Sequence, residues 1–387
     1  MIIEKINNLR NKFKKYKIDG YIVPKNDDYF SEYAKNDRLK KIAKFSGSAG
    51  LAVILNKKNY LFVDGRYTIQ AQQESSDNYK IIEIHKKLPN EIIKNLNLGY
   101  DPSLFTKNIL KKYFSNNNLT AINHNLIDQI FKFKKIKTKP FFSLDKNVVG
   151  ESHHSKISKV VKLIKSNNAD YLFVSAPENV AWLLNIRGHD NPNSPIPNAR
   201  LIICKNKKIY LITKKSNTKT IIKEKKINTK YIVDENNLSN LFYRLEEGNF
   251  IIDNKSCSIL YENIIKKRFK LLKIEDPIYK LKSIKNEQEI KHMIEAHKKD
   301  GLALTKFIYW IKNVNKKVIT EVDAQNRLEK FRKLNPAYLF PSFNTIAGAG
   351  SNGAIVHYRA TPKNTKKIKK QDLLLVDSGG QYKFGTT

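Results

Sequence analysis

Short apolar runs alternate with segments of helical periodicity through the first 280 residues. A run of a few apolar residues is typical of a strand, whereas apolar residues that recur every three or four positions are typical of a helix. This alternation predicts two α/β units, residues 1–147 and 148–280, although their sequences differ too much to be called a repeat. Strands are expected at 21–23, 51–55, 60–63, 81–84, 171–174, 201–204 and 209–212.

The pattern changes near Lys280. From 286 to 314 apolar residues recur at helical spacing, which predicts one long helix. His297 lies on the apolar side of this helix, as a histidine of a core would. Residues 281–387 are therefore expected to form a third unit.

A second helix and short strands are expected in the rest of the third unit. Thr320 and Asp323 resemble a capping box, which begins a helix. Strands are expected at 341–346 and 354–358, on either side of a loop of small residues. The glycines of that loop match a phosphate-binding loop only weakly, because the Lys-Ser/Thr pair of such loops is absent.

The last expected strand carries the most information about function. Residues 373–376 are all apolar, which predicts a strand buried on both faces, and Asp377 follows it directly. An unpaired carboxylate at the edge of a core is costly, so hydrogen-bond donors or a metal ion would have to compensate its charge. His357 follows the preceding expected strand, and two strand ends can converge on one pocket. A histidine and a carboxylate suit a dinuclear metal site, yet two groups alone fall short of one.

The positive charge of the chain has a simple compositional origin. Lys and Arg number 72 against 36 Asp and Glu, which gives a formal charge of +36. Such a charge is typical of nucleic-acid-binding surfaces, but here lysines greatly outnumber arginines and are spread along the chain amid abundant Asn and Ile. Because Lys, Asn and Ile share A/T-rich codons, we attribute the charge to codon bias and expect no specific nucleic-acid partner.

The two cysteines and the hydropathy pattern favour a reducing, aqueous compartment. Cys204 and Cys257 are isolated, so neither a disulfide framework nor a zinc ribbon is indicated. Apolar runs stay well short of membrane length, and the N-terminal segment does not have the pattern of a signal peptide. We therefore expect a cytoplasmic protein with no membrane partner.

Two short motifs have simple structural interpretations. In the segment DGRY, Asp64 is expected to cap a helix and Arg66 to pair with it locally. His153 and His154 suggest a metal site, but adjacent side chains of an extended segment point to opposite faces. We expect a polar linker at these histidines.

Several ordered motifs together resemble one protein family. FSGSAG and DGRY lie in the first unit, NVAWLLNIRG in the second, and SFNTIAGAGSNGAIVHY with LLLVDSGGQYKFGTT in the third. They resemble the three-domain Xaa-Pro aminopeptidases of the aminopeptidase P type, pita-bread metallopeptidases related to prolidase and creatinase. The resemblance implies two creatinase-like α/β domains in tandem, followed by an α+β pita-bread catalytic domain that is incomplete at residue 387.

The resemblance also implies roles for three residues. Asp377, in DSGGQY, matches a ligand of the first of two divalent ions, expected to be Mn²⁺. His357, in GAIVHY, matches a residue that contacts the substrate and helps to stabilise the tetrahedral intermediate without binding metal. Phe343, in SFN, matches an aromatic residue of the substrate pocket. The implied enzyme is a homodimer whose metal-bridging hydroxide cleaves the bond before a proline in second position of a peptide.

One part of the family pattern is missing. The family's second Asp ligand belongs to a TTD motif, and this sequence stops at the second of those threonines, Thr387. A His and two Glu ligands lie later still in the family, so of the five expected ligands this sequence contains only Asp377. One carboxylate cannot hold a dinuclear centre. We therefore expect a C-terminally truncated sequence that is inactive and does not bind metal stably, with residues 373–376 lacking sheet partners.

Two other functions stay open. The first is a catalytically inactive, metal-free binding or scaffold protein of the pita-bread type, which an in-frame TTD continuation would reject. The second, less favoured, is a basic nucleic-acid-binding protein, which undetectable or salt-insensitive binding to nucleic acid would reject.

Overall fold

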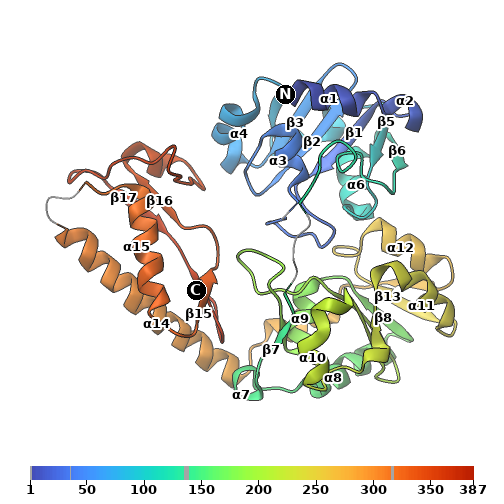
Figure 1. Ribbon diagram of the computed structural model, residues 1–387. Coiled ribbons are helices and arrows are strands. Elements are labelled where there is room, and N and C mark those ends of the chain that lie inside the picture. Colours follow the sequence, from blue (N-terminus) through green and yellow to red (C-terminus); the bar gives the residue numbers. More distant parts are fainter. Residues whose placement is uncertain (1, 35, 135–138, 315–317) are drawn as a thin grey trace.

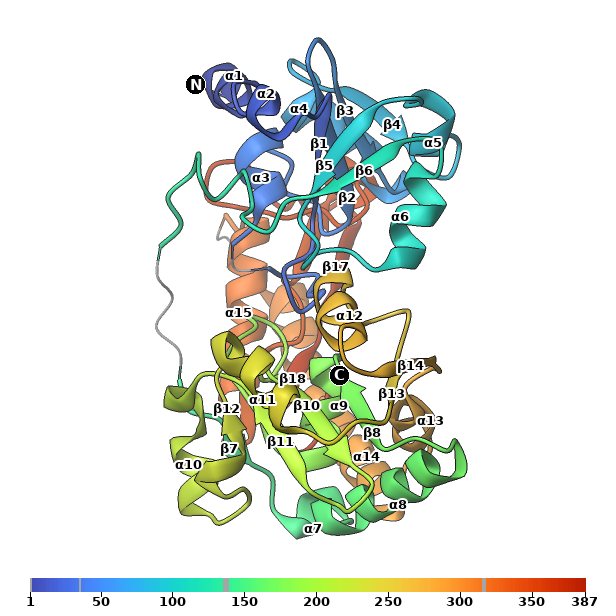
Figure 2. The ribbon, with the colours of Figure 1, turned by 90° about the vertical axis from the view of Figure 1, so that its right-hand side faces the viewer.

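Three bodies make up the computed structural model, which describes residues 2–34, 36–134, 139–314 and 318–387. Two α/β bodies lie one above the other, and a third, built on two long helices, lies beside both (Figure 1). Figure 2, a quarter turn away, shows the long helices of the third body behind the junction of the other two. Among the described residues, the helices are too short or too polar to cross a membrane.

The first body is a six-stranded sheet with the strand order β4-β3-β2-β1-β5-β6. Its side chains alternate between two cores, since Tyr21 and Val23 enter one core and Ile22 the other. Strand β2 is antiparallel to both of its neighbours, β1 and β3, and the remaining pairs are parallel. The strands are β1 (Gly20–Pro24), β2 (Gly50–Leu55), β3 (Asn59–Val63), β4 (Lys80–Glu83), β5 (Asn97–Tyr100) and β6 (Asn118–Ala121), and the helices are α1 (Ile2–Arg10), α2 (Phe13–Tyr16), α3 (Arg38–Ala43), α4 (Thr68–Ser75), α5 (Pro89–Ile92) and α6 (Lys107–Phe114).

The second body repeats this topology strand for strand. Its order is β12-β11-β10-β8-β13-β14, with the same succession of parallel and antiparallel pairs. The two bodies thus share one fold despite their dissimilar sequences. Its strands are β8 (Tyr171–Val174), β10 (Arg200–Cys204), β11 (Ile209–Ile212), β12 (Ile232–Val233), β13 (Asn249–Ile252) and β14 (Lys270–Lys273), with a separate pair β7 (Phe142–Ser143) and β9 (Ile186–Arg187); its helices are α7 (Lys146–Val149), α8 (His153–Ser166), α9 (Pro177–Leu184), α10 (Lys219–Lys223), α11 (Leu238–Arg244), α12 (Ile259–Lys266) and α13 (Pro277–Ser283).

The third body packs two helices against two antiparallel strand pairs. α14 (Glu287–Asn313) and α15 (Glu321–Lys333) are the two expected helices, and the capping box of Thr320 and Asp323 at the start of α15 is confirmed. β15 (Tyr338–Pro341) pairs with β18 (Gly380–Tyr382), and β16 (Ile346–Ala349) pairs with β17 (Leu374–Asp377).

The strands expected on either side of the small-residue loop are wrong. The chain bends between Pro341 and Ile346 because β15 and β16 pair with different partners. After β16, residues 350–354 form a short 3₁₀ helix, and His357 lies in a turn with φ of +57°. The bend and the turn depend on which distant strands pair, and apolar periodicity does not predict that pairing.

Three further expectations, two about burial and one about a linker, are also wrong. Leu373 and Leu375 are 88% and 46% exposed, so the last strand is covered on one face, and it does have a sheet partner in β16. His297 is exposed and contacts the Met293 carbonyl of its own helix, because α14 packs on its neighbours through the stripe of Ala296, Asp300, Ala303 and Phe307. His153 and His154 are not in a linker but begin α8, with ring centroids 4.0 Å apart.

Candidate active site

A cavity of about 680 Å³ lies where the three bodies meet. Phe343, His357 and Asp377, the three residues expected from the sequence, all line it. The cavity is also lined by Pro192 and Asn193 of the second body and by many residues of the first body. Concave sites between domains are common positions for ligands, so this cavity is the candidate active site.

Phe343, Asp377 and His357 lie in a bend, at a strand end and in a turn of the third body, respectively. Phe343 lies in the bend between β15 and β16 and is half-buried. Asp377 ends β17, where it pairs with Ile346, and its side chain is exposed. His357 is exposed in its left-handed turn, a conformation that few residues other than glycine adopt.

Glu321 anchors the turn that carries His357. This fully buried carboxylate accepts hydrogen bonds from Asn352 Nδ2 and the Tyr358 hydroxyl, both at 2.9 Å, and from the backbone N–H groups of Ala349 and Lys366. Burial by itself raises the pKa of Glu321, but these donors together bring the pKa below its usual value. The sequence showed Glu321 only as the first residue of a helix, so this role was missed.

Tyr67 of the DGRY segment reaches His357 from the first body. Its hydroxyl forms a hydrogen bond with Nδ1 of His357, and the two rings meet edge-on with centroids 5.1 Å apart. The Ser48 hydroxyl lies 2.6 Å from the same tyrosine oxygen. Asp64 and Arg66 cap and pair locally as expected, at 2.8 Å, but Tyr67 was missed because its partner lies 290 residues away.

Gly47 of the FSGSAG segment allows this approach. A Cβ atom at Gly47 would lie 2.3 Å from the Phe45 ring and 2.8 Å from the Tyr67 ring. These two rings pack edge-on with centroids 5.8 Å apart, and Tyr67 is only 1% exposed. A glycine is required at this position because the rings occupy the volume of any side chain.

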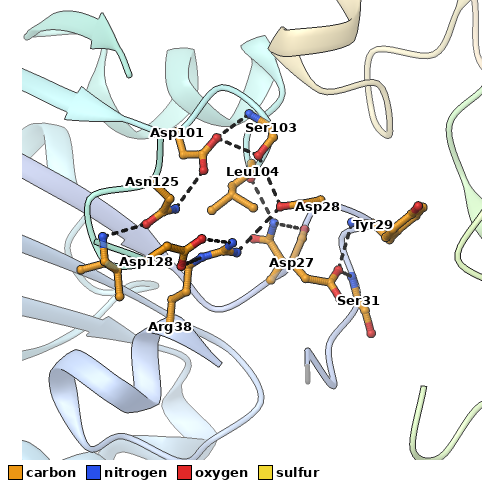
Figure 3. A network of polar contacts seen from close by, with 12 residues as sticks. Asp27, Asp28, Tyr29, Ser31, Arg38, Asp101, Ser103, Leu104, Asn125 and Asp128 are labelled. Carbon is orange, nitrogen blue, oxygen red and sulfur yellow. Dashed lines mark hydrogen bonds and ion pairs between the residues drawn. The ribbon is translucent and has the colours of Figure 1, made fainter. Parts of the chain in front are cut away.

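A polar network holds the loop of residues 27–31, which comes just before cavity-lining residues of the first body (Figure 3). Asp27 accepts from the backbone N–H groups of Tyr29 and Ser31 at 3.0 and 2.9 Å, while Arg38 forms a bidentate pair with Asp128, at 2.8 Å for both bonds. Burial raises the pKa of Asp27. The loop thereby presents residues 32–34 to the cavity.

The proline-containing loop of the second body connects to both neighbours. Asn193, which is buried, donates to the Pro341 carbonyl and accepts from Gln381 Nε2, both at 3.0 Å. Asn191 accepts from the Ser31 hydroxyl at 2.8 Å. These contacts join the three bodies at the cavity.

The NVAWLLNIRG segment does not reach the cavity wall. Asn179 donates to Asp276 at 2.8 Å, and Trp182 donates to Glu289 at 3.1 Å. The segment therefore packs α9 against α13 and α14 and has a structural role.

The described residues do not by themselves form a metal centre. Among them, there is no group of three or more His, Cys, Asp or Glu side chains that could hold a metal ion. Asp377 is thus a single carboxylate, and several fixed ligands are needed for affinity and geometry.

Comparisons with known proteins define the class. Residues 5–130 and 132–289 each match the Creatinase/Prolidase N-terminal domain, and residues 291–387 match Metallopeptidase family M24. Two creatinase-type domains followed by a pita-bread metallopeptidase domain are the architecture expected from the motifs.

Curated relatives narrow this class to one family. "Probable Xaa-Pro aminopeptidase P" of Paracoccidioides brasiliensis is 31% identical over 423 residues, which cover 99% of this chain and 68% of the relative. The protein of the same name from Laccaria bicolor is 31% identical and covers 99% of this chain and 63% of the relative. The chain belongs to the Xaa-Pro aminopeptidase P family, and it spans about two thirds of the length of these relatives.

A solved structure has the same fold. The X-prolyl aminopeptidase from Caenorhabditis elegans, described as a cytosolic enzyme with a di-nuclear active site, superposes with a TM-score of 0.90 at 23% identity. The match covers 100% of this chain and 69% of that protein.

Proposed function

We propose that the protein acts as an Xaa-Pro aminopeptidase, which removes the N-terminal residue from peptides with proline in second position. One observation carries the proposal: in a member of this family, Phe343, His357 and Asp377 line one cavity at the junction of all three bodies. Proline-containing peptides are the proposed substrates.

Each of these residues has a proposed task. Phe343 offers an apolar ring surface to the prolyl ring. His357 donates an imidazole N–H to the carbonyl oxygen as that oxygen gains negative charge, which stabilises the transition state more than the ground state. Asp377 is proposed as one ligand of two divalent ions, with Mn²⁺ as the expected metal, and the match to a metallopeptidase family over residues 291–387 supports this assignment.

The polypeptide of residues 1–387, assayed by itself, is proposed to bind such peptides without hydrolysing them. The support is that Asp377 alone matches the ligand set expected for the family. We further propose a homodimer, on the family resemblance, and a cytoplasmic location, which is supported by the description of the C. elegans protein as cytosolic.

Two measurements test the proposal. Calorimetry compares binding of a tetrapeptide with proline in second position and of the same peptide with alanine there, and we expect the proline peptide to bind more tightly. Phe343→Ala is expected to remove this preference, because the truncation removes the ring that contacts proline. Equal binding of both peptides by the unmodified chain would contradict the proposed substrate class.

The second measurement concerns the reaction. Release of the N-terminal residue is followed with Mn²⁺ and with a chelator, for residues 1–387 and for a chain extended with a relative's C-terminal segment. Release by the extended chain, but not by residues 1–387, would support the proposed enzyme and the assignment of Asp377. Specific binding with no release by either chain, under full metal loading, would instead favour the inactive binding protein.

A further inference from the structure

We propose that Tyr67 is a positioning residue for His357, and that its hydroxyl holds Nδ1 of the imidazole so that the ring proton stays on Nε2. The inference rests on the proposed function, because it concerns the proton that His357 would offer to the substrate. It assigns to the first body a direct part in the chemistry of a site whose reacting groups lie in the third body.

The contact itself involves a defined nitrogen. The Tyr67 hydroxyl is bonded to Nδ1, and among the described residues Nε2 of His357 has no hydrogen-bond partner. A neutral imidazole carries one proton, so whichever nitrogen accepts a hydrogen bond leaves the proton on the other. If Tyr67 donates to Nδ1, the nitrogen available to a substrate is therefore an N–H donor.

Ser48 continues the chain of hydrogen bonds beyond Tyr67. Its Oγ lies 2.6 Å from the Tyr67 oxygen. Each hydroxyl has a single proton, so when Ser48 donates to Tyr67, the proton of Tyr67 is directed to Nδ1. The reverse chain would leave Nε2 without a proton, and an unprotonated nitrogen cannot stabilise an oxygen that gains negative charge.

His357 needs such external support because its own segment leaves it exposed. The residue has a φ of +57°, a strained conformation that is kept only when the surroundings determine it. Tyr67 is a rigid partner, since it is buried and its ring packs against Phe45 over Gly47. The segments FSGSAG and DGRY thus converge on one imidazole of the third body.

Nitrogen NMR of the histidines tests this directly in the 387-residue chain. In protein labelled with ¹⁵N at histidine, the two ring-nitrogen shifts of a histidine report the populations of its two tautomers, and the His357 pair is assigned by its loss in His357→Gln. At a pH where His357 is neutral, we expect a pyridine-type Nδ1 and a pyrrole-type Nε2. In Tyr67→Phe both signals should move toward the average of the two tautomers, and in Ser48→Ala they should move less.

Tyr60→Phe removes a hydroxyl from the same body that has no hydrogen-bond partner among the described residues, and it should leave the His357 pair unmoved. A wild-type spectrum with the proton on Nδ1, or an unchanged His357 pair in Tyr67→Phe, would overturn the inference. The tautomer is read without hydrolysis, so an Nε2–H tautomer in the 387-residue chain, together with no release of the N-terminal residue by the extended chain, would contradict the proposed function and leave this inference standing.

Discussion

The second and third bodies are stabilised in different ways. In the second, β8 and β10 are buried along their whole length between two large apolar cores. In the third, the buried apolar cluster is small, and two buried polar networks join its elements. Three isoleucines of α14, Ile290, Ile294 and Ile308, are 44–53% exposed. Similar apolar patterns therefore led to large buried apolar cores in the second body and to a small apolar core with buried polar networks in the third.

Asp300 is the centre of the second polar network. It forms a bidentate pair with Arg332, at 2.7 and 3.0 Å, and accepts from the Tyr382 hydroxyl at 2.7 Å. Arg332 also donates to Ser378, the residue after Asp377, at 3.0 Å. Although burial raises the pKa of Asp300, these donors bring it below its usual value. The network thus holds α14, α15 and β18 beside the candidate ligand.

The largest effect is expected for Asp300→Ala. The change leaves the Arg332 guanidinium buried without its counter-charge, and we expect a loss of about 4 kcal/mol in the stability of the third body. Hydrogen exchange of peptides from residues 287–387 measures this loss. The double variant Asp300→Leu with Arg332→Met should recover much of it, and a double variant as unstable as the single one would show that charge is not the cause.

The next effect is expected for Leu172→Ala in the core of the second body. Leu172 is fully buried on β8, so the truncation leaves a cavity, and we expect a loss of about 3 kcal/mol. Exchange of peptides from 153–273 should accelerate, whereas peptides from 287–387 should not change. Equal acceleration in both bodies would mean that they unfold as one unit and that the comparison fails.

A pH-dependent effect of about 2–3 kcal/mol is expected from Asp276, a buried carboxyl at the start of α13. Burial raises the pKa of Asp276 to about 6, above the value near 4 of the unfolded chain. The folded state therefore binds a proton that the unfolded state does not bind between these values. Stability from Asp276 is present at low pH and is lost as the pH rises through about 6.

Chemical unfolding of wild type and Asp276→Asn between pH 4 and 7 checks this sign. The wild type should gain stability relative to the variant as the pH falls, and Asp145→Asn, at an exposed carboxyl, should track the wild type. The third body should behave in the opposite way, since the pKa of Asp300 is lowered and its contribution is lost in acid. A parallel pH response in both bodies would contradict the assignment.

The smallest effect is expected for Leu302→Ala on α14. Leu302 is 58% exposed, so little apolar area is lost, and we expect a change below about 0.5 kcal/mol. This variant is the matched counterpart of Leu172→Ala. A loss comparable to that of Leu172→Ala, measured by the same exchange experiment, would show that another surface covers this side of α14 in solution.

Local patterns in the sequence were enough for the elements that depend on near neighbours. The hairpin of β2 and β3, the length of α14 and the cap of Thr320 at α15 were predicted because turn residues, periodicity and capping act over a few positions. The ordered motifs were also enough to identify the family and to select Phe343, His357 and Asp377, which share one cavity.

Tertiary structure alone decided the rest. The turn at His357 depends on Glu321, and the imidazole depends on Tyr67, a residue 290 positions away whose local motif is complete without it. Whether an apolar stripe is buried depended in the same way on what packs against it, so His297 and Leu375 are exposed in spite of their patterns. Periodicity records which side of an element is apolar, and only the packing of distant segments determines whether that side meets protein or water.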